Sequence, residues 1–391
     1  MPRSLSHEPD RSVNQDSPHV GTVPVLRNSY FQTKARTMTE ENFSFLKQLV
    51  ETPSPSGFEQ PAQQVIRKQL SGSGAEMKTD VMGNLIARYG RSDGLRLMLA
   101  GHCDEIGFMV QFVDDRGFIY FGAIGGVDPH LAPGQRVTVH TAQGPVPGVI
   151  GKKAIHLIEP KDRDTVIKLK QQFIDIGCSS RDEVEQLIQI GDPVTFAVGL
   201  QRLQGDRATS RAFDDKMGAY IVTEVMKKVS KQAECPCDLY AVSTVQEEVG
   251  LRGGATSTYG VNPDIGIVVE VTHATDYPEV EQSSIGRVEL GKGPVIARGA
   301  NINPRLFEML IETAKSENIP VQIIGVPRAT GTDANVMQLS RGGVATALLG
   351  IPLRYMHTPV ETLSLSDLDA AIDLLSALVM RIDSTTSFIP A

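Results

Sequence analysis

The chain contains several short apolar segments, each followed by a histidine or a carboxylate. Strands that are buried on both faces of an α/β sheet read as continuous apolar runs of this length. Binding and catalytic sites in such sheets form at the strand ends. The pattern therefore predicts an α/β fold with its chemistry gathered at the ends of its strands. The segments are Leu95–Gly101 before His102, Leu239–Thr244 before Glu247 and Glu248, Ile265–Val269 before Glu270, and the segment that precedes His357.

The chain divides into three parts by composition and hydrophobic periodicity. Residues 1–36 are rich in Ser, Pro, Asn and Arg and have no sustained period, which predicts a disordered N-terminal extension. Helical and strand patterns alternate in residues 37–107 and again in 206–391, which together predict one α/β domain. The intervening residues, 108–205, read as paired strands joined by Gly-containing turns. They predict an inserted small β domain.

Apolar periodicity and helix start signals predict the individual elements. Thr37 and Glu40 read as a capping box that begins a helix, and Pro53 ends it. A second helix is expected to begin at Pro61, with further helices at 216–228, 305–317 and 366–382. Strands are expected at 84–89, 95–101, 239–244, 265–271 and 320–326, and hairpin strands at 108–113, 118–121, 136–140 and 146–150.

Composition excludes several classes of protein. The chain has 38 basic and 46 acidic residues, a net charge of −8, which argues against nucleic-acid binding because that needs a basic face. No apolar run is long enough for a membrane span or a secretory signal. Four cysteines are too few and too scattered for a disulfide-linked secreted scaffold, so we expect a cytoplasmic protein. Cys235 and Cys237, separated by one proline, are expected to be surface thiols.

Three of the eight histidines, His102, His273 and His357, follow apolar segments. Asp104 lies two residues after His102, and alternate residues of an extended chain point the same way. The carboxylate can therefore orient the imidazole, an arrangement found behind metal-binding histidines. A buried histidine with no ligand is the alternative for His102.

Pairs of adjacent acids supply the other candidate ligands. Asp214 and Asp215 precede a predicted helix, where they could bind a metal or cap the helix. Glu247 and Glu248 are adjacent, so they cannot share one face of a strand end. One can bind a metal while the other contacts a metal-bound water. The alternative is that both lie in a solvated, charged loop. With Glu270 and the histidines, these acids form a ligand mix suited to a pair of zinc or cobalt ions.

In this order and spacing, these residues resemble the glutamyl or tetrahedral aminopeptidases, a self-compartmentalising family of dinuclear metallopeptidases of which some carry an endoglucanase label. The resemblance covers about residues 38–385. It is carried by the stretches 101–110, 211–218, 245–254, 269–278, 331–336 and 339–361, and by 156–158 and 174–177 in the β insertion.

The resemblance implies a role for each site residue and two divalent metal ions per subunit, zinc or alternatively cobalt. Asp215 is implied to shape the turn at Asp214, where related enzymes keep a non-proline cis peptide. Substrate-pocket positions are implied at Gly331, Thr332 and Asp333, with His273 as a further candidate. Asp214 is implied to bridge the two metals. His102 and Glu270 are implied to bind the first metal, and Glu248 and His357 the second. Glu247 is implied to act as general base and acid, and Asp104 to orient His102.

The fold that the resemblance implies is a zinc-exopeptidase-like central mixed sheet flanked by helices. Residues 37–107 and 206–391 would form this catalytic domain, and 108–205 a small β-barrel-like dimerisation domain. Family members assemble as dimers and as hollow tetrahedra of twelve subunits, which predicts a homo-oligomer here. The implied partners are peptide substrates, with no nucleic acid and no membrane.

One departure from the family concerns Glu270, where Asp is usual. Because this acid is linked to aminopeptidase or carboxypeptidase preference in related enzymes, a carboxypeptidase or deacylase is the alternative to an aminopeptidase. A non-catalytic scaffold is a further alternative, which intact Glu247 disfavours. Glycoside hydrolysis is disfavoured by the absence of Trp. A preference for acidic substrates would call for a basic pocket residue, and the candidates are Arg252, Arg298 and Arg328.

Overall fold

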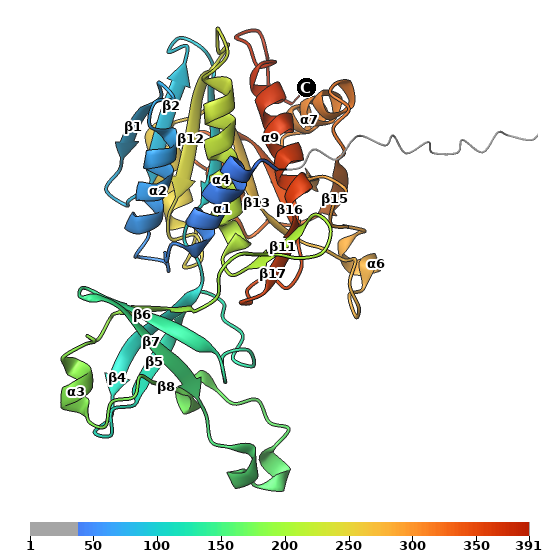
Figure 1. Ribbon diagram of the computed structural model, residues 1–391. Helices are drawn as coiled ribbons and strands as arrows, with labels where there is room; N and C mark the ends of the chain where they lie inside the picture. Colours follow the sequence, from blue (N-terminus) through green and yellow to red (C-terminus); the bar gives the residue numbers. More distant parts are fainter. Residues whose placement is uncertain (1–37, 391) are drawn as a thin grey trace, which may run out of the picture. The chain divides into compact units, whose positions relative to one another are not determined.

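The structure is a computed structural model that describes residues 38–390 (Figure 1). The predicted extension at residues 1–36 and Thr37 of the predicted capping box lie outside the described residues. Within the described part, no helix is both long and apolar enough to cross a membrane.

A mixed sheet of eight strands forms the centre of the fold, as predicted. Its four central strands run parallel, and the outer strands β2 and β14 run antiparallel to their inner neighbours. The central strands therefore carry their carboxyl ends to one edge of the sheet. The order is β1 (Glu76–Thr79), β2 (Leu85–Gly90), β12 (Asp238–Thr244), β3 (Arg96–His102), β13 (Ile265–His273), β16 (Ala345–Leu353), β14 (Val295–Gly299) and β15 (Gln322–Val326).

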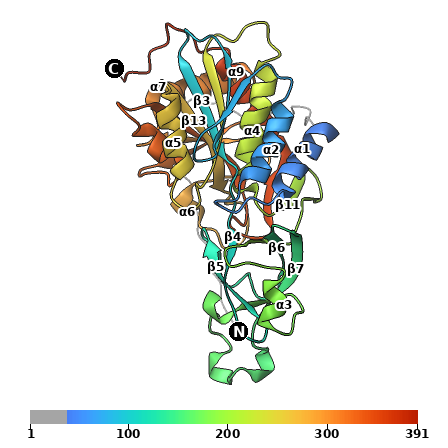
Figure 2. The ribbon, with the colours of Figure 1, turned by 90° about the vertical axis from the view of Figure 1, so that its left-hand side faces the viewer.

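Helices cover both faces of this sheet, which is the layered arrangement expected of an α/β domain (Figure 2). On one face, α4 (Phe213–Val229) packs against β3, β12 and β13, and it contacts α1 (Glu40–Glu51), α2 (Gln60–Leu70) and α9 (Leu365–Val379). On the other face lie α5 (Arg252–Val261) and α8 (Asp333–Gln338). The remaining elements of this domain are α6 (Gln282–Ile285), α7 (Pro304–Ser316) and a small sheet of β10 (Gln201–Arg202), β11 (Arg207–Ser210) and β17 (Glu361–Ser364).

The close approach of α4 to β3 depends on a glycine. A Cβ atom at Gly101 would lie 2.4 Å from the backbone carbonyl carbon of Gly218 on α4. Only glycine permits the two backbones to come so near. The first turn of α4, with Asp214 and Asp215, is thereby held against the end of β3.

A buried ion cluster fixes the same region from behind. Glu105 is 2% exposed and accepts hydrogen bonds from both Arg211 and Lys216, the latter at 2.7 Å. Lys216 also donates to the backbone oxygen of Thr52 at 2.5 Å. Burial disfavours the ionised acid, but the two cations outweigh it and lower the pKa of Glu105 to about 2. The start of α4 is thus tied to the end of α1 and to the segment after β3.

The predicted β insertion contains a closed barrel. Phe108 packs edge-on against Phe121 and Phe196, with ring centroids 4.8 Å and 5.3 Å apart, in the centre of an apolar core. A barrel-like inserted fold was predicted, and this is confirmed. The strands, in order around the barrel, are β4 (Gly107–Val113), β5 (Ile119–Ile124), β8 (Phe173–Asp175), β7 (Gly144–Gly151), β6 (Arg136–Thr141) and β9 (Pro193–Phe196), accompanied by α3 (Arg181–Glu185) and short 3₁₀ helices at Ile155–Leu157, Pro160–Asp162 and Leu169–Gln171.

Some local predictions were wrong. The first helix is capped by Thr39, whose side chain accepts from the backbone nitrogen of Asn42, and not by Thr37. Cys235 and Cys237 are buried at 3% and 0% exposure, because they lie under the turn that carries Gly90 rather than on the surface. Strands β1, β14 and β16 were not predicted as strands.

Candidate metal centre

The parallel strands bring the predicted ligands to one edge of the sheet. His102 is the last residue of β3 and lies beside Thr244, the last residue of β12, three residues before Glu247. Glu270 lies near the end of β13, paired with Gly350 of β16, the strand that leads to His357. Residues that are far apart in the sequence therefore meet at the carboxyl ends of four neighbouring strands.

The carboxylate of Asp214 lies between two histidines. Its Oδ1 is 3.3 Å from Nε2 of His102, and its Oδ2 is 3.2 Å from Nε2 of His357. On the first side, Oε2 of Glu270 is 3.6 Å from the same nitrogen of His102. On the second side, Oε1 of Glu248 is 3.5 Å from the same nitrogen of His357. The carboxylate of Asp214 thus lies beside both histidines, and each histidine also has a glutamate oxygen nearby. Donor atoms of His102, Asp214 and Glu248 all lie within 4.8 Å of one another.

These separations match the edges of a metal coordination shell. Zinc binds histidine nitrogen and carboxylate oxygen at about 2.0–2.2 Å, so two ligands of a tetrahedral ion lie about 3.3 Å apart. The four separations, between 3.2 and 3.6 Å, are near that value. They are longer than the commonest donor–acceptor distance of an N–H···O hydrogen bond, about 2.9–3.0 Å.

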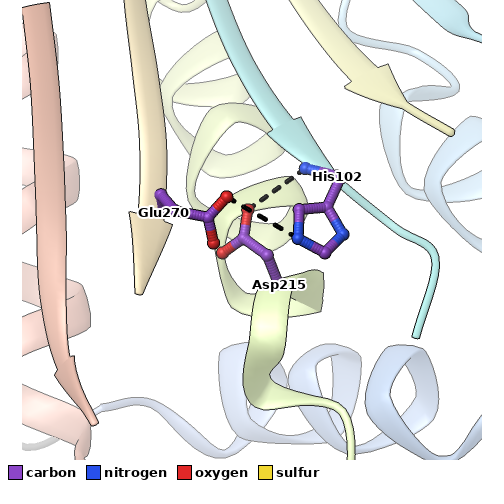
Figure 3. Close-up of side chains that lie close together, drawn as sticks. All are labelled: His102, Asp215 and Glu270. Carbon is purple, nitrogen blue, oxygen red and sulfur yellow. Dashed lines mark hydrogen bonds and ion pairs between the residues drawn. The ribbon is translucent and has the colours of Figure 1, made fainter. Parts of the chain in front are cut away.

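Asp215 has a different role from Asp214, although its carboxylate also lies near His102 and Glu270. Its Oδ2 accepts from the backbone nitrogen of His102 at 3.1 Å, and its Oδ1 accepts from the backbone nitrogen of Gly218 at 3.1 Å. Figure 3 shows Asp215 reaching the His102 backbone while Glu270 points at the His102 ring. The peptide bond between Asp214 and Asp215 is cis, as the resemblance implied. Asp215 therefore holds backbone in place and leaves Asp214 to face the histidines.

Asp104 is fully buried, and it orients the turn with Glu247 and Glu248 as well as the ring of His102. The Nδ1 atom of His102 lies 3.1 Å from the backbone oxygen of Asp104 and 3.4 Å from its carboxylate. The carboxylate also accepts from the backbone nitrogens of Glu247 and Glu248, at 3.0 Å and 3.2 Å, and from the hydroxyl of Ser56 at 2.7 Å. One acid thus fixes the ring of His102 and the turn that carries both glutamates.

The ring of His357 is oriented by the loop that follows β5. Its Nδ1 lies 3.0 Å from the backbone oxygen of Gly126, which leaves Nε2 directed at Asp214 and Glu248. Glu361, at 1% exposure, accepts from the backbone nitrogen of His357 at 3.0 Å with one oxygen and from that of Asp214 at 3.1 Å with the other. Glu361 therefore connects two candidate ligands.

Backbone strain also gathers here. Ala212, Gln246 and His357 all have left-handed backbone, with φ of 61°, 56° and 61°. Such φ values are uncommon outside glycine and persist where the surroundings enforce them, often at functional sites. Each of the three is a candidate ligand or lies within two residues of one.

The electrostatics of the cluster are those of a site built around positive charge. Burial raises the pKa of Glu247 to about 7 and that of Glu248 to about 8, and nearby Asp214 adds to both shifts. Burial likewise raises the pKa of Glu270 well above its ordinary value. Hydrogen bonding to Asp214 raises the pKa of His357 to about 9. Crowded carboxylates of this kind repel one another unless a cation lies between them.

The donor set fits divalent metal ions. Oε1 of Glu248 is buried and has no hydrogen-bond partner in the described structure, although such atoms are rarely left unpaired. It is the atom that faces His357. Imidazole nitrogens with carboxylate oxygens are ligands for zinc and related metals.

A cavity of about 560 Å³ opens beside this cluster. Gly331, Thr332 and His273, predicted as pocket residues, line it. Asp333 does not, because it is 1% exposed and its Oδ2 accepts from the hydroxyl of Thr244 at 2.7 Å. The lining residues are Gly126, Asp214, Glu247, Glu248, Gly250, Leu251, Glu270, Val271, Thr272, His273, Ile324, Val326, Thr330, Gly331, Thr332, Leu348, Met356 and His357.

This cluster, at the carboxyl edge of a helix-covered mixed sheet, is a candidate metal site. The family profile of the M42 glutamyl aminopeptidases matches residues 83–374. The chain belongs to the M42 family, whose members depend on metal, and is an enzyme of the metallo-aminopeptidase class.

Individual relatives are similar to this chain over nearly their whole length. The lysyl aminopeptidase of Pyrococcus furiosus is 38% identical over 343 residues, which are 86% of this chain and 96% of that protein. The structure of a TET aminopeptidase from a marine-sediment thaumarchaeote is 34% identical and has a TM-score of 0.84, covering 88% of this chain and 97% of the other. The TET1 peptidase of Pyrococcus horikoshii, which can assemble into a tetrahedron or a large octahedral shell, is 30% identical with a TM-score of 0.78, covering 86% and 99%.

Sequence reasoning named Asp104 and Asp215 as supports of the ligands but missed Glu361, Ser56 and Gly126. Glu361 lies four residues after His357, a spacing that could have drawn attention to it. Ser56 and the backbone oxygen of Gly126 carry no signal in the sequence. Their roles follow only from the fold.

Proposed function

We propose that the chain is a dinuclear metallo-aminopeptidase that removes N-terminal amino acids from peptides. The observation that carries the proposal is the position of Asp214, whose two oxygens each lie 3.2–3.3 Å from a different histidine. A carboxylate so placed can serve two cations at once. His102 and Glu270 would complete one ligand set, and Glu248 and His357 the other. Zinc suits these ligands best, and cobalt is the alternative.

Glu247 is assigned as general base and acid. A pair of divalent cations supplies charge that acidifies an attacking water and polarises the scissile carbonyl. Glu247 lines the cavity, and its Oε2 is 3.7 Å from Nε2 of His102, at the edge of the ligand cluster. There its carboxylate takes the proton of the attacking water and delivers it to the departing amine. Asp104, which accepts from the backbone nitrogen of Glu247, holds the base in position.

The free N-terminus of the substrate would be anchored beside the metal that Glu270 helps to hold. Its Oε1 accepts from the backbone nitrogen of Val271 at 2.9 Å, so the longer side chain is folded back onto its own strand. Its Oε2 nevertheless stays 3.6 Å from His102. A free α-amino group anchored there would place the first peptide bond of the substrate at the cations, which is the basis of exopeptidase action from the N-terminus.

The experiment compares wild-type protein with Glu247→Gln on unblocked aminoacyl-arylamides and their N-acetylated forms, with zinc or cobalt. Wild type should cleave only the unblocked set. Glu247→Gln should bind metal normally and lose turnover by at least about 100-fold, because the proton transfer step has no acceptor. Glu312→Gln, on the exposed side of α7, is the matched control. Retained turnover in Glu247→Gln would refute the role of Glu247, and cleavage of the blocked set would favour the deacylase alternative.

We also propose that the chain is a homo-oligomer, a dimer through the barrel domain or a larger shell of twelve. The support is the assembly stated for the Pyrococcus horikoshii relative, which shares the fold over 99% of its length. Native mass spectrometry of the full chain measures the number of subunits. A monomer at micromolar concentration would contradict this proposal.

A further inference from the structure

We infer that the cavity beside the metal centre selects substrates whose N-terminal side chain is apolar and uncharged. The inference rests on the proposed aminopeptidase function and adds the substrate class. It comes from the chemistry of the cavity wall opposite the ligand cluster.

The wall beyond the ligands is apolar. Ile324 and Val326 are alternate residues of β15 and both line the cavity. Leu348 of β16 and Met356 add further aliphatic surface, and Leu251 closes the side next to the glutamate turn. The lining residues with uncharged polar side chains are Thr272, Thr330 and Thr332.

The titratable residues that line the cavity are the four acids at the candidate metal centre and two histidines, His273 and His357. The four acids are Asp214, Glu247, Glu248 and Glu270, of which three would hold the cations and Glu247 would act as the base. Among the described residues, no lysine or arginine lines the cavity. The three arginines considered from the sequence lie elsewhere. Arg298 stacks over the ring of Phe307 at 5.2 Å, Arg252 donates to the side chain of Gln246 at 3.3 Å, and Arg328 is not part of the wall.

A charged side chain would therefore enter without a partner. A glutamate carboxylate would find no cation beyond the metals, and a lysine ammonium would find no acid outside the ligand cluster. Placing an unpaired charge against the apolar part of the wall is unfavourable, whereas an aliphatic side chain gains from that contact. The family name and the Pyrococcus furiosus relative each name a charged residue, glutamyl and lysyl. The cavity wall of this chain offers neither charge a counterpart.

The test is the ratio of kcat/KM among leucyl, methionyl, glutamyl and lysyl arylamides with the metal-loaded full-length protein. We expect the apolar pair to exceed both charged substrates by at least about 100-fold, a ratio typical of a pocket that leaves a polar group unpaired. Glutamyl or lysyl substrate within about tenfold of leucyl would overturn the inference while leaving the proposed function intact. Failure to cleave any unblocked substrate with metals bound would overturn both.

A pair of variants links the preference to the wall. Ile324→Lys should lower turnover of leucyl substrate and raise the glutamyl-to-leucyl ratio by at least about tenfold, because it adds the missing counter-charge. Ile323→Lys, the adjacent residue of β15, is 54% exposed and does not line the cavity, so the ratio should not change. An unchanged ratio in folded Ile324→Lys, or an equal change in both variants, would contradict the assignment.

Binding supplies a readout that does not need turnover. Leu-Ala, Glu-Ala and Lys-Ala can be titrated calorimetrically into metal-loaded Glu247→Gln. We expect Leu-Ala to bind at least about tenfold more tightly than the other two. Equal affinities, or tighter binding of a charged dipeptide, would count against an apolar pocket.

Discussion

Glu361→Gln should weaken metal binding although Glu361 is not a ligand. The two oxygens of Glu361 accept from the backbone nitrogens of Asp214 and His357, at 3.1 Å and 3.0 Å, and the residue is 1% exposed. Glutamine has one oxygen, so its amide group would face a buried N–H donor. An unsatisfied buried donor costs about 1–3 kcal/mol. Relief of that conflict moves Asp214 or His357 and disturbs the ligand set that they share.

The assays for this prediction separate position from stability. Loss of a group that orients metal ligands lowers affinity by about 10–100-fold. Competition with a chromogenic chelator measures that affinity, and urea unfolding of the metal-free protein measures the 1–3 kcal/mol. Glu312→Gln provides the same chemical change on an exposed helix surface. Unchanged zinc affinity in Glu361→Gln would refute the reasoning, whatever the loss in stability.

Further predictions concern the supports of the site. Gly126→Ala should reduce metal affinity and turnover, because the added Cβ would lie 2.9 Å from Nδ1 of His357. Gly260→Ala is the control and should change neither, because its added Cβ would have no atom within 4 Å. Chelator competition measures the metal affinity of both variants. Glu105→Gln should lower the free energy of unfolding by about 3–5 kcal/mol, because it leaves two buried cations without their anion, and urea unfolding at neutral pH measures the loss. The pKa of Glu105 lies at about 2, below its usual 4.5, so its stabilisation is complete above pH 4.5 and is lost as the pH falls toward 2. The stability of Glu105→Gln should therefore lack the part of the acid dependence that Glu105 contributes to wild type between pH 4.5 and 2. An identical pH dependence of unfolding in wild type and Glu105→Gln would contradict this prediction.

The sheet could be predicted because its strands are strongly apolar and end in rare residues. β3 and β13 are buried along most of their length, so continuous apolar sequence identified them. The segment before His357 was recognised as apolar, but β16 contains Gly350 and Pro352 and was not predicted as a strand, although all of it except Ala345 is buried. β1 is short and largely exposed, so it has no apolar period to detect.

The candidate positions could be narrowed from the sequence because histidine and paired acids at strand ends are few, and the family resemblance then chose the ligands among them. Their supports could not be named so easily. Glu361 acts through backbone nitrogens of residues up to 147 positions away, and the backbone oxygen of Gly126 orients His357 across 231 positions. Asp333 follows two pocket residues in sequence, but the first turn of α8 directs it toward Thr244 instead of the cavity. Such roles depend on tertiary contacts that carry no local pattern.

The most direct test of the proposed dinuclear centre is the number of metal ions per chain after dialysis against zinc, measured by plasma mass spectrometry. Wild type should hold two. His357→Ala should hold one, because the ligand set of His102, Asp214 and Glu270 stays complete. Asp214→Ala should hold none tightly, since both sets lose their shared carboxylate. A wild-type protein that binds fewer than two ions, or an Asp214→Ala variant that retains both, would contradict the account.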